Sequence, residues 1–138
     1  GIESLVEFIA QLSVRGKKII NFGVSGRQSD EDIQKFAKVT AKNFDLYILR
    51  NYHMDMDMIL KNPKHEDVPE MLKMELMRNG VLEKQIIVSP NVMKSLDQGL
   101  ESAKEGDLLI VLTRVAGTDK FKVVKKLKEA AADLLIVH

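Results

Sequence analysis

The sequence predicts a single α/β domain over residues 1–138, with a mostly parallel, open sheet between two layers of helices. Short apolar runs alternate along the chain with longer stretches in which apolar residues recur every three or four positions. This is the order expected of strands that alternate with amphipathic helices. The short runs are apolar throughout, as expected of parallel strands that helices cover on both faces. We therefore expect a three-layer α-β-α, doubly wound fold of the Rossmann-like kind.

Five stretches carry the helical spacing. Val92, Leu96 and Leu100, for example, follow one another at intervals of four residues and so share one face of a helix. Gly16 and Gly80 each follow such a stretch, and glycine commonly ends a helix. The predicted helices are Ile2–Val14, Asp30–Asn43, Glu66–Asn79, Asn91–Lys104 and Asp119–Ala132.

The apolar runs have the length of strands. In an open parallel sheet, ligands bind beyond the carboxyl ends of the strands, so the segments that follow these runs are where a site is expected. The predicted strands are Lys18–Phe22, Leu46–Leu49, Gln85–Val88, Leu108–Leu112 and Leu134–Val137.

The segment Gly23–Asp30 follows the first predicted strand and leads into a helix. Gly23 and Gly26 allow a ligand to approach the backbone closely, and the start of the helix offers unpaired N–H groups and a positive dipole end. Arg27 adds a positive charge with a planar fork of donors. We expect this corner, with Asp30 at the start of the helix, to contact a phosphate or another anion.

The same segment has a purely structural interpretation, namely a tight turn followed by a capped helix. Ser29 and Asp32 have the spacing of a capping box, in which side chains pair with the first N–H groups of a helix. Neither of the well-known nucleotide fingerprints, G-x-G-x-x-G and G-x-x-x-x-G-K-[ST], is present. Both interpretations remain open at the level of the sequence.

Two further strand ends carry arginines. Arg50 and Asn51 follow the second predicted strand, and Thr113 and Arg114 follow the fourth. Arginine holds a carboxylate or a phosphate through two parallel hydrogen bonds. Because Arg27, Arg50 and Arg114 all follow strands at the same edge of the sheet, that edge is a candidate site for a carboxylate or a phosphate. The alternative is that each of them is an ordinary surface residue.

Other polar clusters are assigned no site. His53, Asp55 and Asp57 have the composition of a cation or amine site, but an acidic surface loop is the commoner arrangement, and we assign no metal ligands. A basic stretch near the C-terminus is expected to be a solvated helix face. Its residues are Lys120, Lys122, Lys125, Lys126 and Lys128.

Composition excludes several classes of function. The chain has 21 basic and 20 acidic residues and 5% aromatic residues, so we expect neither nucleic acid nor a membrane surface as a partner. It contains no cysteine, which excludes disulfides and thiolate chemistry. The sequence shows no secretory signal and no apolar run as long as a membrane span, and we expect a cytoplasmic protein.

Several segments together resemble the C-terminal domain of the Mur ligase family, and within it the cyanophycin-synthetase-like branch. Gly26–Ile33 resembles the G-D-R-R-D-E-D-I segment of that branch, and Asn43–Arg50 resembles its FDRIIV(R/K) strand. Val68–Leu72 resembles the EVPRLL helix. Glu105–Ile110 resembles the PGDLLLI strand, and Thr113-Arg114 resembles the T-R that follows it. The resemblance extends roughly from the N-terminus of the chain to this point.

The resemblance implies part of an ATP-dependent amide-bond-forming enzyme. Ligases of this family use ATP and Mg²⁺ to form an acyl phosphate on a carboxylate, which the amine of an amino acid or peptide then attacks. The central domain carries the phosphate loop. The C-terminal domain closes over it, helps to hold the nucleotide and positions the incoming amine, and such closure excludes water from a reactive intermediate.

The chain departs from the family pattern in several respects, and the residues from Val115 onward match it poorly. Gly26 is followed directly by Arg27, where the family has an aspartate after the glycine, and the chain has no Gly-Lys-Thr/Ser phosphate loop of its own. We therefore expect a fragment of a larger ligase that works with a central ATPase domain, is inactive in isolation and binds no cofactor tightly by itself. The alternative is a free-standing, flavodoxin-like binding or regulatory module for a phosphate-bearing ligand or a protein partner.

Overall fold

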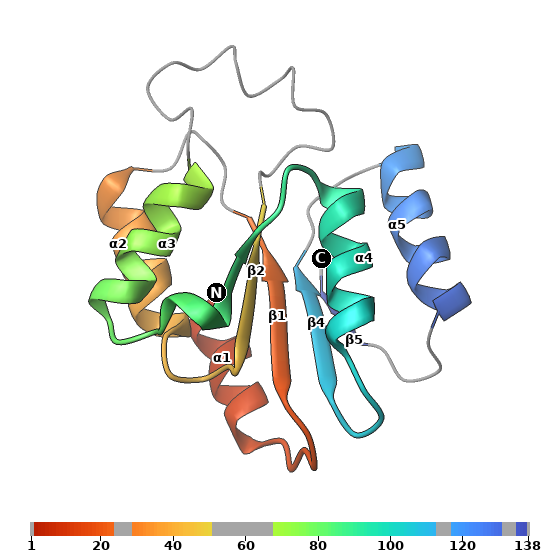
Figure 1. Cartoon of the computed structure of the whole chain (residues 1–138), viewed down its shortest axis with the longest axis horizontal. Coiled ribbons are helices and arrows are strands. Elements are labelled where there is room, and N and C mark those ends of the chain that lie inside the picture. The colour runs from red at the N-terminus through yellow and green to blue at the C-terminus, as the bar shows by residue number, and fades with distance from the viewer. Residues whose placement is uncertain (1, 24–28, 51–67, 113–116, 131–134, 138) are drawn as a thin grey trace.

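The computed structural model describes residues 2–23, 29–50, 68–112, 117–130 and 135–137. Helices and strands alternate through these ranges, as the sequence predicts (Figure 1). None of the helices in this part of the chain has both the length and the apolar character needed to cross a membrane. The helices are α1 (Ile2–Gln11), α2 (Asp30–Thr40), α3 (Val68–Arg78), α4 (Val92–Ser102) and α5 (Gly117–Ala130), with a short 3₁₀ turn, η3 (Glu83–Gln85).

The strands form one five-stranded sheet in the order β3-β2-β1-β4-β5, and every pairing is parallel. They are β1 (Lys18–Phe22), β2 (Leu46–Leu49), β3 (Ile86–Val88), β4 (Leu108–Leu112) and β5 (Leu135–Val137). Ile20 of the central strand β1 lies beside Tyr47 of β2 and Ile110 of β4. The predicted parallel sheet is confirmed.

Helices cover both faces of the sheet, which confirms the predicted three layers (Figure 1). Side chains alternate between the faces along each strand. Ile20 and Phe22 of β1 therefore pack with α1, α2 and α3 on one face, and the ring of Phe22 stacks on that of Phe36 at 4.9 Å between centroids. Ile19 packs with Val92 and other residues of α4 and α5 on the opposite face.

Helix α2 ends at Thr40, although the sequence predicts a helix to Asn43. The buried Tyr47 hydroxyl donates a hydrogen bond to the Thr40 carbonyl oxygen at 2.9 Å. The Asn43 side-chain amide donates to the carbonyl oxygens of Val39 and Ala41 at 3.0 and 3.2 Å. These contacts satisfy carbonyl groups at the end of the helix, and one of them comes from a strand that local periodicity does not reveal.

Other predicted helices are also longer than the observed ones. Helix α1 ends at Gln11 and α4 at Ser102, while α3 ends one residue before the predicted Asn79. The Lys18 ammonium donates to the Ile9 carbonyl oxygen at 3.0 Å near the end of α1. Gln85, predicted as the first residue of a strand, lies instead in η3.

Gly80 and Gly16 have different roles. Gly80 has φ 95° and lies two residues beyond Arg78, the last residue of α3, which confirms its predicted place at a helix end. Gly16 was predicted to end α1, but it lies against the turn before β4. Its N–H donates to the Gly106 carbonyl oxygen at 2.9 Å, and a Cβ at this position would lie 2.0 Å from the Asp107 carboxylate. Glycine is required at position 16 because two loops meet there.

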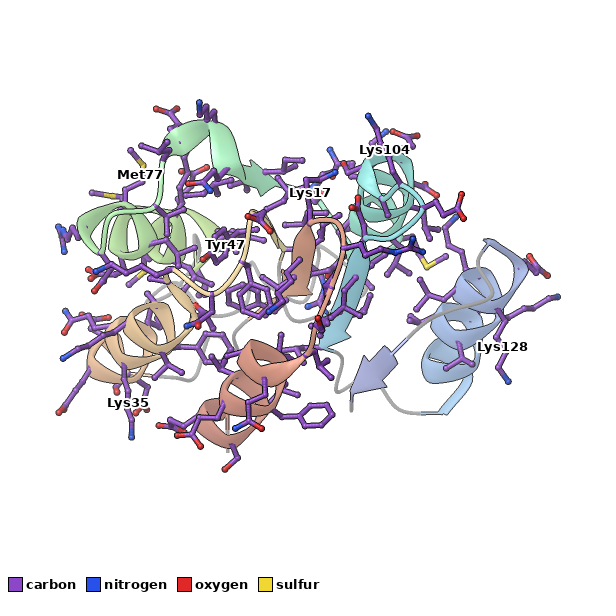
Figure 2. All side chains as sticks on the ribbon, turned by 90° about the horizontal axis from the view of Figure 1, so that it is seen from below. Lys17, Lys35, Tyr47, Met77, Lys104 and Lys128 are labelled. Atoms are coloured by element: carbon purple, nitrogen blue, oxygen red, sulfur yellow. The ribbon has the colours of Figure 1, made fainter. Side chains whose placement is uncertain are left out.

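The same turn holds Asp107 at the amino-terminal edge of the sheet. Its carboxylate accepts hydrogen bonds from the Lys104 N–H at 2.9 Å, the Lys17 N–H at 2.7 Å and the Lys17 ammonium at 2.9 Å. The Lys104 N–H and then the two Lys17 groups lower the pKa of Asp107 from 3.8 to about 2. Figure 2 views the molecule from this end and shows Lys17 and Lys104 there. The carboxylate thus ties the start of β1 to the start of β4.

Asp107→Asn removes the charge from this carboxylate and leaves at least one N–H donor poorly paired. We expect the free energy of unfolding to fall by about 1 to 2 kcal/mol at neutral pH. A lowered pKa stabilises the fold above the ordinary value of 3.8, and this contribution disappears as the pH falls toward 2. The difference in the free energy of unfolding between wild type and variant, measured by urea denaturation at several pH values, should therefore become smaller as the pH falls over that interval.

Glu105→Gln is the matched control for this experiment. Glu105 is an exposed residue of the same turn, so its replacement should leave the pH dependence unchanged. A difference in the free energy of unfolding between wild type and Asp107→Asn that stays constant from pH 5 to about pH 2 would contradict the assigned role of the Asp107 charge.

Candidate functional site

The direction of the strand order reverses between β1 and β4. From β1 the chain adds β2 and then β3 on one side, and it then crosses to β4 and β5 on the other side. In open parallel sheets such a switch point leaves a crevice at the carboxyl ends of the two central strands, and ligands bind there. The end of β1 at Phe22 and the end of β4 at Leu112 define this point here.

Arg50 bridges the switch point from the neighbouring strand. Its N–H donates to the Phe22 carbonyl oxygen at 3.2 Å, which continues the pairing of β2 with β1. Its side chain donates through Nε to Asn21 Oδ1 at 3.1 Å and through Nη2 to the carbonyl oxygen of Leu112. The arginine is only 3% exposed. The positive charge of the residue that follows β2 is therefore held across the end of β1 and against the end of β4.

A second pair of polar groups extends this arrangement to α4. Asn21 lies within β1, is fully buried, and donates through Nδ2 to Ser95 Oγ at 2.9 Å. The Ser95 hydroxyl donates in turn to the Val92 carbonyl oxygen at 2.6 Å in the first turn of α4. Arg50, Asn21 and Ser95 thus form one buried polar chain, which we call the switch-point network.

Ser89 lies at the same edge, directly after β3. Its N–H donates to the Leu49 carbonyl oxygen at 2.7 Å, and the residue is 2% exposed. The Ser89 hydroxyl has no hydrogen-bond partner among the residues that the structure describes. The carboxyl edge from β3 to β4 is therefore lined with buried polar groups, in contrast to the apolar strands that lead to it.

The start of α2 supports its structural interpretation. Ser29 is the N-cap, and its hydroxyl oxygen accepts a hydrogen bond from the Asp32 N–H at 3.1 Å. Asp30, Glu31 and Asp32 are exposed in the first turn. These carboxylates already complement the positive end of the helix dipole and repel an added anion. The predicted cap is confirmed, and the helix terminus by itself is poorly suited to bind phosphate.

Only part of the predicted site lies within the described residues. Gly23 is half-buried beyond β1, Asp30 is exposed as the first residue of α2, and Arg50 is buried at the switch point. Asp30 lines a shallow hollow between α2 and α3 whose lining does not include Arg50. The remaining predicted site residues, which lie outside the described residues, are Gly26, Arg27, Asn51, Thr113 and Arg114.

The structure describes only one of the polar clusters that were assigned no site. His53, Asp55 and Asp57 lie outside the described residues, and no three potential metal ligands come together in the ranges that the structure describes. On α5, Lys122, Lys125 and Lys128 are exposed, which confirms the predicted solvated face for these residues, and Figure 2 shows Lys128 on the outer side of the molecule. Lys126 of the same helix is half-buried and pairs with Asp97 of α4 at 2.6 Å.

Sequence reasoning missed Asn21 and Ser95. Asn21 is a polar residue in an otherwise apolar run of strand length, and Ser95 lies three residues after Val92 on the buried face of α4. A polar residue at a position where the pattern calls for a buried side chain indicates a buried polar contact, because a buried amide must find hydrogen-bond partners. The signal marks each residue but does not reveal that the two contact each other.

Comparison with known proteins gives a distant sequence match and a structural neighbour. No family model matches the chain. A crystal structure of a universal stress protein in complex with cAMP superposes with a TM-score of 0.42 at 19% identity, covering 91% of this chain and 98% of that one. The chain is 27% identical over 137 residues to the UDP-N-acetylmuramoyl-L-alanyl-D-glutamate–2,6-diaminopimelate ligase of Aquifex aeolicus (strain VF5).

The sequence match covers 99% of this chain but 26% of the ligase, so the chain spans about a quarter of the length of that relative. It supports the resemblance to the Mur ligases over nearly the whole chain. The cyanophycin-synthetase-like branch stays a prediction. The chain is thus an α/β domain with a distant similarity to a Mur ligase.

Proposed function

We propose that this chain is the substrate-closing domain of an ATP-dependent ligase that joins a carboxylate to an amine. The observation that carries the proposal is the position of Arg50, a cation held across the switch point of a parallel sheet. The distant similarity to a ligase over 137 residues supports it. In this proposal the carboxyl edge of the sheet faces a central ATPase domain and receives an anionic substrate group.

The electrostatics of this edge favour the side near Arg50 over the start of α2. The carboxylates of Asp30, Glu31 and Asp32 surround the α2 terminus, and Ser29 already caps it. The Arg50 guanidinium lies in a buried environment, where a charge acts more strongly than in water. An anion is therefore expected near β1 and β4, with Gly23 allowing close approach and Arg27 as its direct partner.

ATP and Mg²⁺ belong to the proposal as cofactors of the complete enzyme, where they supply the phosphoryl group that activates the carboxylate. The domain described here contributes one wall of the cleft. Gly26 and Arg27 face the nucleotide in this proposal, while Asn51, Thr113 and Arg114 flank the incoming amino acid or peptide. Because the second wall of the cleft belongs to the central domain in this proposal, we expect this chain alone to bind the ligands weakly.

Titration of the isotope-labelled chain with Mg²⁺ and ATP tests where the nucleotide binds. We expect chemical-shift changes at the backbone amides of Gly23, Arg50 and Ser89, with half-saturation near millimolar concentration, because only one wall is present. The amides of Gly16 and Gly106 at the opposite edge serve as internal controls and should not move. Changes confined to the opposite edge, or no change at any amide, would contradict the proposed binding edge.

The affinity measured in this titration also separates the two candidate functions. Half-saturation at micromolar ATP would mean that the chain binds nucleotide without a second wall, as a free-standing binding module does. That result would overturn the ligase proposal while retaining the site.

Arg27→Ala removes the proposed direct partner of the anion. We expect the affinity for ATP to fall by about tenfold, equivalent to the loss of one hydrogen-bonded charge pair. Arg15→Ala is the matched control, since Arg15 is exposed at the amino-terminal edge. Equal affinities for wild type and Arg27→Ala in the same NMR titration would remove Arg27 from the site.

A further inference from the structure

The switch-point network has a single direction. The Arg50 Nε–H donates to Asn21 Oδ1, Asn21 Nδ2–H donates to Ser95 Oγ, and the Ser95 O–H donates to the Val92 carbonyl oxygen. Each group in this series donates to the next one toward α4. Hydrogen bonds arranged in this way polarise one another and strengthen the series.

The direction is imposed from the α4 end. A carbonyl oxygen only accepts, so the Ser95 hydroxyl must give its proton to Val92, and its oxygen then accepts from Asn21. The amide nitrogen of Asn21 has to face Ser95, which leaves the amide oxygen facing Arg50. A rotated amide would bring its NH₂ group against the Nε–H of Arg50 and its oxygen against an oxygen that has no further proton to give.

We propose that Asn21 is a positioning residue that orients the Arg50 guanidinium over the switch point, and that Ser95 in turn fixes the Asn21 amide. The inference rests on the proposed function for its role in ligand binding, but the geometry of the network is independent of it. The first turn of α4 thereby influences the orientation of a charge that follows β2, through the side chain of a β1 residue.

The amide at position 21 also determines the net charge beside the Arg50 guanidinium. Asparagine offers Arg50 an acceptor without adding a negative charge beside the guanidinium. An aspartate would accept the same hydrogen bond and oppose the binding of an anion. Position and charge can therefore be separated by substitution at position 21, and the link to α4 by substitution at position 95.

The first experiment follows hydrogen exchange of the Arg50 Nε–H by nitrogen-15 NMR. In Ser95→Ala the amide of Asn21 loses the contact that sets its direction, and we expect the Nε–H to exchange at least about tenfold faster, as for the loss of one buried hydrogen bond. Ser95→Thr keeps the hydroxyl and should restore slow exchange.

Two internal references make this measurement specific. The backbone amide of Ile48 in β2 reports opening of the whole fold, so exchange of the Arg50 Nε–H is expressed relative to it. The Nε–H of Arg78, an exposed residue of α3, should not respond to either variant. Unchanged relative exchange at Arg50 in Ser95→Ala would overturn the proposal, because Ser95 would then have no part in holding the guanidinium.

The second experiment uses Asn21→Asp and Asn21→Leu. Asn21→Asp should keep the Arg50 Nε–H protected but weaken ATP binding by about tenfold, because the new carboxylate competes with the anion. Asn21→Leu has no acceptor and should lose both protection and affinity. Wild-type protection of the Nε–H in Asn21→Leu would show that Asn21 does not position Arg50.

The two measurements distinguish failure of this inference from failure of the proposed function. If wild-type protein gives no chemical-shift change with Mg²⁺ and ATP, the proposed binding edge is contradicted, while the exchange data still decide the role of Asn21 and Ser95. If ATP binds at the carboxyl edge but the exchange rate of the Arg50 Nε–H is the same in all four variants as in wild type, the positioning role of Asn21 and Ser95 is wrong and the proposed function stands.

Discussion

The pairing of β1 with β2 on one side and β4 on the other is the constraint on which the rest of the structure depends. A central parallel strand is covered by helices on both faces, so its side chains are buried whichever way they point. Ile19 and Ile20 meet that demand with apolar side chains. Asn21 meets it by pairing with Arg50, which follows β2, and with Ser95 of α4. The strand that organises both cores therefore also carries the polar centre of the candidate site.

Polar groups buried at such a point are costly unless each finds a partner. The switch-point network satisfies this condition with a hydroxyl, an amide and a guanidinium that come from three different elements. Replacing one member of such a network leaves its partners unpaired in a buried environment, so each member depends on the others. At the opposite edge Asp107 pairs with Lys17 and joins the two loops that precede β1 and β4. That pair is structural and lies away from the switch point.

Of the three residues in the switch-point network, the sequence predicts one and does not indicate the other two. Arg50 was predicted because it follows an apolar run, and the end of a parallel strand is a position that sequence reveals directly. Asn21 and Ser95 are separated by 74 positions, and no local pattern indicates that they contact each other. The sequence allows two interpretations of the first turn of α2, and the hydrogen bond from the Asp32 N–H to Ser29 in the structure favours the structural one.

The sequence by itself determined that this is an α/β domain with parallel strands, since the spacing of apolar residues follows from burial of each segment, which is a local property. The order of the strands, the switch point and the meeting of Arg50 with Asn21 were decided by tertiary structure. So were the end of α2 at Thr40, where Tyr47 takes the carbonyl oxygen, and the need for glycine at position 16. The physical reason is the same in each case: these features depend on groups that are distant in the chain, and their positions follow only from how the layers pack.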